Sequence, residues 1–240
     1  MSDTLVLIGG LDPTGGAGLL RDAWTIAALG LYAEVQAIVS ALTRQGRGRP
    51  AEAFPVAPER LRGELDRLHD VAVVKLGMIA SAQVGVLAEA LDRLRGEGAK
   101  IVLDPVWRAS DGGWIGARPA ELLGLARHVD LITPNRDELA ALRALGPIPC
   151  ASLSKGEPVG AERIRDRLIL PEGREWIFER DRVPGPDPRG TGCALASAIA
   201  CELARGCALE LACARAIEWL DRARLQTIRG LDERRHLASA

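Results

Sequence analysis

Short apolar runs alternate with longer segments of helical periodicity along this chain. Runs rich in Val, Ile and Leu predict strands at Thr4–Ile8, Val35–Val39, Val71–Leu76, Lys100–Asp104 and Asp130–Thr133. Between them, apolar residues three and four apart predict helices at Ala17–Leu29, Pro58–Leu68, Ala82–Arg95 and Arg136–Leu145. Such alternation is typical of βαβ units, so we expect an α/β fold with a mostly parallel central sheet flanked by helices.

The C-terminal third of the chain shows a less regular pattern. Trp176–Phe178 predicts a short strand, and the Pro- and Gly-rich segment Val183–Arg189 predicts irregular backbone up to Gly190. Two further helices are predicted, at Gly192–Arg205 and Leu209–Arg229. Arg44–Pro50 is polar and rich in Gly and Arg, so we expect a mobile loop there, within a single domain over residues 1–240.

Composition and charge narrow the classes of function. The 240 residues are 48% apolar and 26% charged with a formal net charge of −1, and the Arg residues form no basic block, so we expect no nucleic acid and no membrane as partner. No run of about 18 apolar residues occurs and the chain enters its first strand directly, which predicts a cytoplasmic, unprocessed protein. Five cysteines without a CxxC pair and three scattered histidines suggest neither a zinc site nor disulfides. Small ligands are the expected partners.

Gly9–Gly18, with the sequence GGLDPTGGAG, follows the first strand and opens a helix. Glycine leaves no side chain in the way, so such a loop brings backbone N–H groups close to a ligand. The loop is not a Walker A motif, because no Lys-Ser/Thr follows the glycines. The plain alternative is a tight strand-to-helix turn.

Arg189–Ala194, with the sequence RGTGCA, ends the irregular segment and begins a helix of small residues. Unpaired N–H groups at a helix start form a cradle for an anion such as phosphate. Cys193 lies in the first turn, where we expect a lowered thiol pKa and a thiolate available as a base. The alternative is a helix cap followed by a small core residue.

Two carboxylates complete the candidate chemistry. Asp104 ends an apolar strand before Pro105, and Glu138 follows the Thr133-Pro134-Asn135 turn. The carboxyl edge of a parallel sheet borders the ligand crevice of open α/β folds, and Mg²⁺ prefers such hard oxygens. The alternatives are a turn residue for Asp104 and a solvated first-turn acid for Glu138 in a helix capped by Asn135.

Taken in order, these segments resemble the hydroxymethylpyrimidine kinase branch of the ribokinase superfamily. The matching pieces span nearly the whole chain: Asp12–Gly18, Ala28–Gly30, Ala41–Gln45, Lys75–Met78, Val102–Val106, Leu131–Asn135 with Glu138, and Gly190–Cys193. The Gly-Thr-Gly-Cys end is typical of this branch, whereas most sugar and nucleoside kinases of the superfamily carry Asp at the position of Cys193.

The resemblance implies a three-layer α/β/α ribokinase-like fold and ATP-dependent phosphorylation of hydroxymethylpyrimidine, its monophosphate, or both. It implies a crevice with the pyrimidine on one side and ATP with Mg²⁺ on the other. Cys193 would be the base, and the N–H groups of Gly190, Thr191, Gly192 and Cys193 would stabilise the transferred phosphoryl group. The resemblance further implies ring contacts from Gln45, Asp22, Gly10, Met78 and Val106, ATP contacts from Lys155 and Asn135, and Mg²⁺ held by Asp104 and Glu138. From its composition and its place beside Gln45, we also expect the Arg44–Pro50 loop to close over the substrate.

The sequence departs from the family pattern at two places. The segment between Gly146 and Lys155 is shorter than usual, and a basic residue expected after Val106 is missing, with Arg108 as the candidate substitute. Two alternatives therefore stay open: a pyridoxal or pyridoxine kinase, and a pyrimidine-sensing module with weakened catalysis. The resemblance also leaves a homodimer open.

Overall fold

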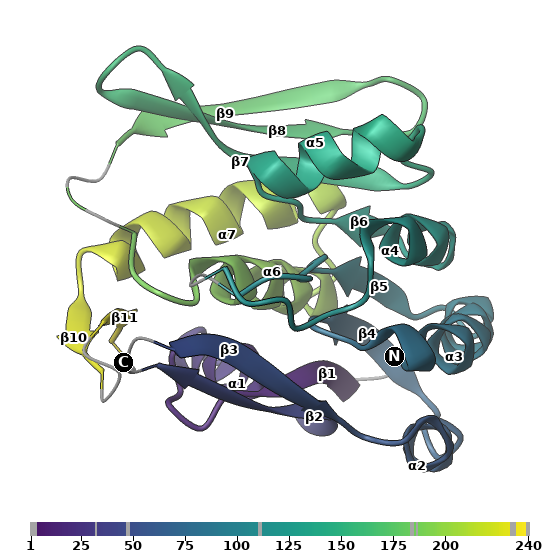
Figure 1. Ribbon diagram of the computed structural model, residues 1–240. Helices are drawn as coiled ribbons and strands as arrows, with labels where there is room; N and C mark the ends of the chain where they lie inside the picture. Colours follow the sequence, from purple (N-terminus) through teal and green to yellow (C-terminus); the bar gives the residue numbers. More distant parts are fainter. Residues whose placement is uncertain are drawn as a thin grey trace.

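The computed structural model describes residues 4–31, 33–46, 49–109, 112–182, 185, 187–230 and 234–238, without the side chains of residues 45, 46 and 49. Nine strands of this part of the chain form one sheet in the order β3-β2-β1-β4-β5-β6-β7-β8-β9 (Figure 1). The strands from β2 through β1, β4, β5 and β6 to β7 are parallel, whereas β3, β8 and β9 pair antiparallel to their neighbours. The expected mostly parallel sheet is therefore confirmed, with antiparallel pairs added at both edges. The strands are β1 Thr4–Leu11, β2 Glu34–Gly46, β3 Arg49–Pro55, β4 Val71–Leu76, β5 Lys100–Leu103, β6 Leu131–Ile132, β7 Ala151–Val159, β8 Arg163–Ile169 and β9 Glu175–Asp181.

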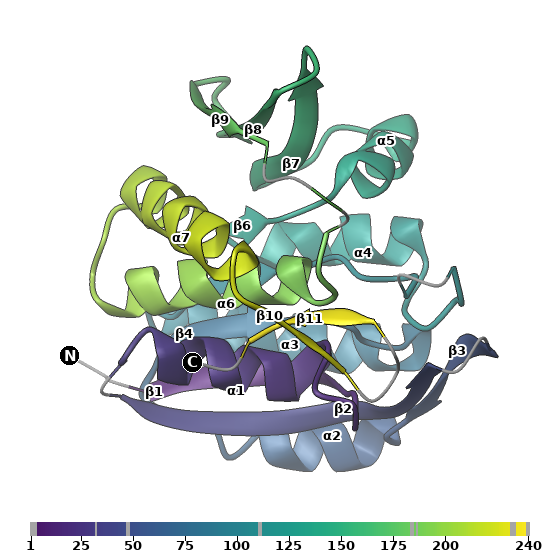
Figure 2. The same ribbon diagram turned by 90° about the vertical axis from the view of Figure 1, so that its left-hand side faces the viewer.

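Helices cover both faces of the sheet, as Figures 1 and 2 show. The helices are α1 Gly18–Ala28, α2 Pro58–Leu65, α3 Val84–Gly96, α4 Pro119–Leu125, α5 Arg136–Leu145, α6 Thr191–Ala204 and α7 Leu209–Arg224, with short 3₁₀ turns at Ser81–Gln83 and Ala126–His128. One apolar core joins the sheet to α2, α3, α4 and α5, and the other joins it to α1, α6 and α7. The result is the expected three-layer α/β/α arrangement.

The alternation of side chains along β1 explains why the sheet is covered on both faces. Successive strand residues point to opposite faces, and in β1 all four residues from Leu5 to Ile8 are apolar and fully buried. Leu5 and Leu7 belong to the core beneath α1, α6 and α7, whereas Val6 and Ile8 belong to the core beneath α2–α5. A continuous apolar run therefore requires helices on both sides.

The segment Arg44–Pro50 corrects the expectation of a mobile loop. Its described residues continue β2 and begin β3, with Arg44 opposite Glu52 and Gly46 opposite Arg49 in an antiparallel pair, while residues 47 and 48 lie outside the described part. Backbone hydrogen bonding between the two strands overrides the polar composition. The predicted strand Val35–Val39 therefore covers only part of the first half of β2.

The strands β7, β8 and β9 form an antiparallel meander at one edge of the sheet. The sequence pattern predicts only Trp176–Phe178 of this unit, because polar residues interrupt the alternation along β7 and β8. Most of the β7 and β8 residues beyond Ser154 are half-buried or exposed. A continuous apolar signal is absent where a strand lies at a solvated edge.

The C-terminus folds back over the sheet. The predicted helix Leu209–Arg229 ends at Arg224, and Thr227–Arg229 instead forms β10, which pairs antiparallel with β11, Arg235–Leu237. Figure 2 shows this hairpin lying across α1. Among the described residues, no helix combines the length and apolarity needed to cross a membrane.

Candidate active site

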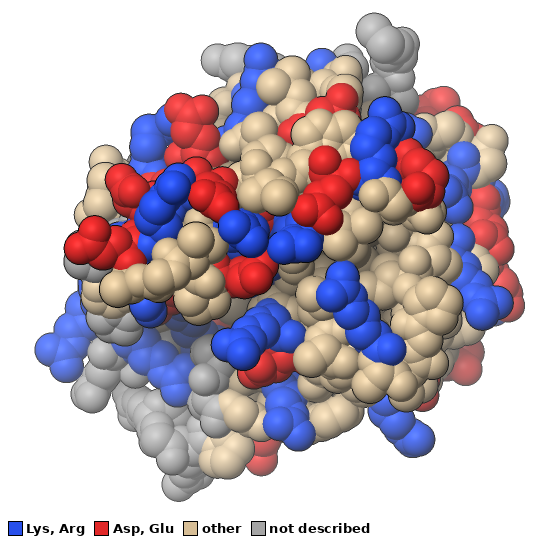
Figure 3. Space-filling view, turned by 90° about the horizontal axis from the view of Figure 1, so that it is seen from above, with Lys and Arg blue, Asp and Glu red and all other residues tan. Residues whose placement is uncertain are grey.

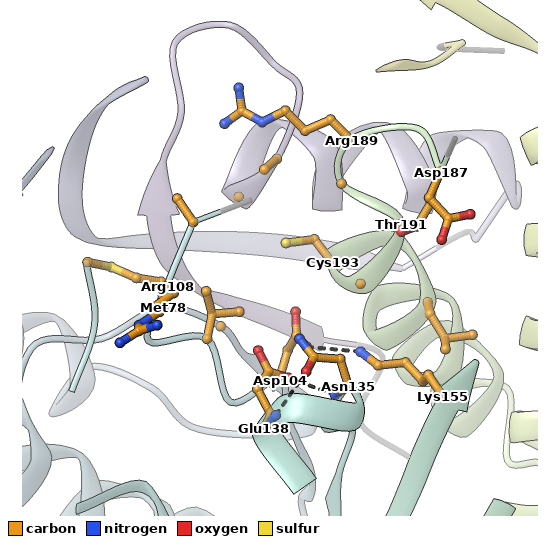
Figure 4. Close-up of a pocket in the computed structure, with 18 of the residues that line it drawn as sticks. Met78, Asp104, Arg108, Asn135, Glu138, Lys155, Asp187, Arg189, Thr191 and Cys193 are labelled. Carbon is orange, nitrogen blue, oxygen red and sulfur yellow. Dashed lines mark hydrogen bonds and ion pairs between the residues drawn. The ribbon is translucent and has the colours of Figure 1, made fainter. Parts of the chain in front are cut away.

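The carboxyl ends of the parallel strands open into a cavity of about 1310 Å³. Twelve of the sequence-predicted site residues line this one cavity: Gly10, Asp22, Met78, Asp104, Val106, Asn135, Glu138, Lys155, Gly190, Thr191, Gly192 and Cys193. The thirteenth, Gln45, lies in β2, and its side chain is outside the described part of the structure. In Figure 4, Asp104 and Lys155 on one side and Cys193 at the start of α6 on the other face the same space.

Glycines bring the loop after β1 against the loop before α6. Gly190 has a φ of +84°, and a Cβ there would overlap the carbonyl oxygen of Gly16. An ion pair joins the same two loops, since Arg189 Nη2 lies 2.8 Å from Asp12 Oδ2 and both side chains are at least 96% buried. Only glycine permits this approach at position 190, which explains two of the glycine-rich motifs together.

The start of α6 faces the carboxylate side of the cavity. No side-chain hydrogen bond caps this helix, and its first intrahelical bond runs from Ala194 N to Gly190 O at 2.9 Å. The preceding N–H groups therefore have no acceptor within the helix. A Cβ placed on Gly192 would lie 3.5 Å from Lys155 Nζ and 3.7 Å from Asp104 Oδ2. Backbone N–H groups and an ammonium group thus converge where an anion can bind.

Asp104 directly follows β5 and is buried at the floor of the cavity. Its Oδ1 atom accepts a hydrogen bond from Thr133 Oγ1 at 3.3 Å and lies 3.4 Å from Lys155 Nζ. Its Oδ2 atom is buried and has no hydrogen-bond partner among the described residues. A buried carboxylate oxygen without a partner beside an open cavity fits a hard cation such as Mg²⁺.

Glu138 has a structural role as well as a place in the cavity. It forms a capping box with Asn135: Glu138 N donates to Asn135 Oδ1 at 2.9 Å, and Asn135 N donates to Glu138 Oε2 at 2.8 Å (Figure 4). Burial raises the pKa of Glu138 to about 7, aided by the nearby Asp104 and opposed by Lys155. The expected Asn135 cap is therefore confirmed, whereas the alternative of a solvated acid at Glu138 is wrong, because its side chain is buried beside the cavity.

Cys193 points into the cavity from the first turn of α6 (Figure 4). The expected fall of its thiol pKa is wrong, because burial raises that pKa to about 12. Lys75 and a backbone hydrogen bond with Gly18 lower it, whereas the carboxylates of Asp22 and Asp104 raise it further. At the first turn of this helix, desolvation and two neighbouring acids outweigh the helix dipole.

The other end of the cavity is apolar. Met78 packs in a small core cluster with Ala41 of β2, Ala51 of β3 and Ile115, and Val106 is packed against that cluster. The Met78 Sδ atom lies 3.3 Å from the position of a Cβ on Gly10, so a side chain at position 10 would press on Met78. This end offers a flat apolar wall of the kind that accepts an aromatic ring.

Arg108 lies on the apolar side of the cavity and away from Lys155 in the view of Figure 4. Its guanidinium carbon is 5.3 Å from the ring centre of Trp114, and the two residues also form a backbone bridge. This contact with an aromatic face holds the cation near the apolar end of the cavity. The structure thus places Arg108 far along the cavity from the α6 start.

Residues 12–234 match the phosphomethylpyrimidine kinase family. The chain belongs to this family. The curated relatives include the thiamine biosynthesis multifunctional protein ThiED of Corynebacterium glutamicum, 32% identical over 96% of this chain, and the chain spans 32% of that protein's length. The hydroxymethylpyrimidine/phosphomethylpyrimidine kinase of Escherichia coli is 33% identical over 80% of each chain. The resemblance drawn from the motifs is thereby confirmed.

Solved structures similar to this chain support the expected ribokinase-like fold. The pyridoxal kinase of Staphylococcus aureus in complex with ADP superposes with a TM-score of 0.81 at 17% identity, over 100% of this chain and 94% of that one. The same enzyme in complex with AMP-PCP and pyridoxal gives a TM-score of 0.80, over 99% and 93% of the two chains. At this identity the likeness concerns the fold.

Two charged residues that line the cavity are not predicted from the sequence. Lys75 lines the cavity at 1% exposure and pairs with Asp22, and Asp166 lines it from β8 at 0% exposure. A single Lys inside the apolar strand Val71–Leu76 was the available signal for the first, because a buried ammonium needs a carboxylate partner. No comparable signal marks Asp166, whose burial depends on the unpredicted β7–β9 meander.

Proposed function

We propose that this kinase phosphorylates 4-amino-5-hydroxymethyl-2-methylpyrimidine, its monophosphate, or both, with ATP as donor. One observation carries the proposal: the anion cradle of α6, Lys155 and the unpaired oxygen of Asp104 meet at one end of a cavity whose other end is apolar. The names of the curated relatives supply the substrate class. The two ends suit a charged triphosphate and a small aromatic ring.

The acceptor oxygen and the γ-phosphorus would meet between these two ends. The hydroxymethyl oxygen attacks phosphorus, the bond from phosphorus to the β,γ-bridging oxygen breaks, and ADP leaves. Phosphoryl transfer depends on alignment and charge stabilisation more than on covalent chemistry. The N–H groups of Thr191, Gly192 and Cys193 lie where they can stabilise charge on the transferred group, and Lys155 adds a positive charge across the gap.

Mg²⁺ would be held by Asp104 and Glu138, directly or through water. It supplies neutralisation of the donor's phosphate charge when bound. Lys155 would hold the phosphates in place by its charge, since its ammonium already lies beside Asp104. Asn135 would keep the start of α5 in place on the same side through the capping box.

Cys193 would take the proton that the acceptor hydroxyl loses. Because its thiol is protonated at neutral pH in the free protein, this role requires release of the thiol proton as substrates bind. Lys75, whose charge favours the thiolate, is the residue suited to assist. We expect Cys193→Ala to lower kcat about 100-fold or more while the Kd of the pyrimidine stays within about tenfold.

On the substrate side, Met78, Val106 and Gly10 would contact the ring, with Asp22 behind them and Gln45 as hydrogen-bonding partner. The solved pyridoxal kinases make pyridoxal the second acceptor to test. They share the fold at 17% identity, whereas the pyrimidine kinase relatives reach 33%. The pyrimidine reading is therefore the stronger one.

The deciding experiment measures ADP release with Mg·ATP and three acceptors in parallel: hydroxymethylpyrimidine, its monophosphate and pyridoxal. Turnover on either pyrimidine supports the proposal, and the pair shows whether one step or both are catalysed. Turnover on pyridoxal alone replaces the proposal with the second candidate. If no acceptor gives ADP release but calorimetry shows pyrimidine binding, the kinase reaction is rejected and the protein is a pyrimidine-sensing module.

A further inference from the structure

A β-bulge in β7 lies at Lys155, the residue that faces Asp104. Ser154 pairs with Arg167 of β8 and Glu157 pairs with Arg165, so β7 has one residue more than β8 between these two pairs. The extra residue falls at Lys155–Gly156, and Gly156 has a φ of +74°. Bulges bend a strand and re-aim a side chain, and they are frequent beside active sites.

Asp166 of β8 fixes this bulge. Gly156 N donates to Asp166 Oδ1 at 2.7 Å, and Asp166 is fully buried. The other carboxylate oxygen, Oδ2, lies 2.7 Å from Arg180 Nη1 of β9. A buried carboxylate that binds both the bulge and a guanidinium leaves the Lys155 backbone little freedom.

The contact continues from Arg180 to the loop before α6. Arg180 Nε lies 2.6 Å from Asp221 Oδ2, Asp221 Oδ1 lies 3.6 Å from Arg224 Nη1, and Arg224 Nη2 lies 2.7 Å from Asp187 Oδ1. We call this series of residues the ion-pair chain: Asp166, Arg180, Asp221, Arg224 and Asp187. The chain joins the bulge of β7 to α7 and to the segment that leads into Gly190.

The ion-pair chain runs along the cavity. Asp166, Arg180, Arg224 and Asp187 all line it, and the side chains of Arg180 and Arg224 are only 15% and 10% exposed. Other ion pairs of the same strands lie on the solvated side: on the face seen in Figure 3, basic and acidic side chains are interspersed. Arg165 and Glu179, 2.6 Å apart, belong to this exposed set. The chain is therefore shielded from Asp166 to Arg224, whereas the side chain of its last member, Asp187, is 69% exposed.

We infer that Asp166 is a positioning residue for the donor triphosphate, and this inference rests on the proposed function. Through the bulge, Asp166 fixes the position of Lys155. Through the ion-pair chain, it holds that lysine at a constant position relative to the loop before α6, where the anion cradle begins. Both groups must address the same phosphates, so a shift of about 1 Å between them weakens donor binding. Acceptor binding, at the apolar end, does not depend on the chain.

Asp166→Asn keeps the shape of the side chain and removes the charge that pairs with Arg180. We expect it to raise the Kd of Mg²⁺ plus AMP-PNP, measured by calorimetry, and the KM for ATP by about tenfold, because the ion pair of Asp166 with Arg180 is lost. The kcat at saturating ATP and the Kd of the pyrimidine should stay within about threefold. Arg180→Met should weaken nucleotide binding by a similar factor. The double variant should bind the nucleotide no more weakly than the weaker-binding single variant, because both substitutions break the same ion pair.

Glu179→Gln is the matched control, since it breaks the ion pairs of Glu179 with Arg163 and Arg165 on the same two strands, away from the cavity, and should leave nucleotide affinity unchanged. If Asp166→Asn binds Mg²⁺ plus AMP-PNP as tightly as Glu179→Gln does, the inference is wrong, even if its melting temperature is lower. If Asp166→Asn does not fold, Arg224→Gln decides by the same criterion from the other end. The two proposals can fail separately. If nucleotide binding depends on Asp166 but the protein phosphorylates no acceptor, the proposed function is wrong and the inference about Asp166 stands.

Discussion

The ammonium group of Lys75 lies 2.7 Å from a carboxylate oxygen of Asp22, and the two side chains are 1% and 0% exposed. Ser197 of α6 donates to the other oxygen of Asp22 at 2.9 Å. The interaction therefore ties β4, α1 and α6 together directly below Cys193. Burial lowers the pKa of Lys75, but the charges of Asp22, Cys193 and Asp104 outweigh it and raise that pKa above its usual range.

Lys75→Met should be strongly destabilising, because it leaves the Asp22 carboxylate buried without its cation. Removing one partner of a buried ion pair destabilises a protein by about 3–5 kcal/mol. Urea unfolding of the variant and the wild type would measure this loss as a difference in the free energy of unfolding. The double variant Lys75→Met/Asp22→Asn should recover part of the loss, since the unpaired charge is gone. Glu89→Gln, which breaks the exposed Arg62–Glu89 pair, is the control and should change little. A double variant less stable than Lys75→Met would contradict this account.

Alanine substitutions at Gly192 and Gly190 should distinguish a loss of activity from a loss of stability in the anion cradle. A Cβ at Gly192 meets nothing closer than Lys155 Nζ at 3.5 Å, so Gly192→Ala should fold with an unchanged melting temperature. Its methyl group, however, projects into the gap before Asp104 where the phosphoryl group must lie, and we expect kcat/KM to fall about 100-fold. Gly190→Ala, at a φ of +84° and against Gly16, should lower the melting temperature as well. Gly192→Ala with wild-type turnover would remove the α6 start from the site.

The parallel half of the fold could be predicted because its residues repeat a simple pattern. The predicted strand Lys100–Asp104 is an apolar run that ends in a carboxylate, so both the strand and the position of Asp104 at its carboxyl end follow from the sequence. The glycine motifs predicted backbone close to a ligand, but the approach of Gly190 to Gly16 appears only in the structure. These features depend on local sequence and on the common direction of parallel strands.

The features that the sequence did not predict correctly depend on contacts between residues that are distant in the sequence. The β2–β3 hairpin and the β7–β9 meander are polar edge elements held by pairing with neighbours, and β10–β11 is held by its contact with Arg189. The thiol pKa of Cys193 depends on Asp22 and Asp104, which lie on other elements of the fold. A position in the first turn of a helix predicts the direction of the dipole, but not the burial that outweighs it.

The thiol of Cys193 offers a pH test of that correction. With a pKa raised to about 12, the free protein should show a Cys193 alkylation rate that rises about tenfold per pH unit from pH 7 to 10, because only the thiolate reacts. Iodoacetamide with peptide mass spectrometry measures this rate site by site, and Cys193→Ser confirms the assignment. A plateau reached below pH 9 would restore the lowered pKa expected from the helix start.

Glu138 gives the last prediction, through the pH dependence of stability. The folded protein holds the Glu138 proton up to about pH 7, whereas an unfolded Glu loses it near its usual pKa of about 4.3. This contribution to stability is complete below about pH 4.3 and is lost as the pH rises to about 7, by roughly 3–4 kcal/mol. Glu138→Gln keeps the capping box and cannot ionise, so without Mg²⁺ it should match the wild type in urea at pH 4.5 and exceed it in stability at pH 8. Equal stability of the two proteins at pH 8 would show that Glu138 ionises in the folded state at little cost.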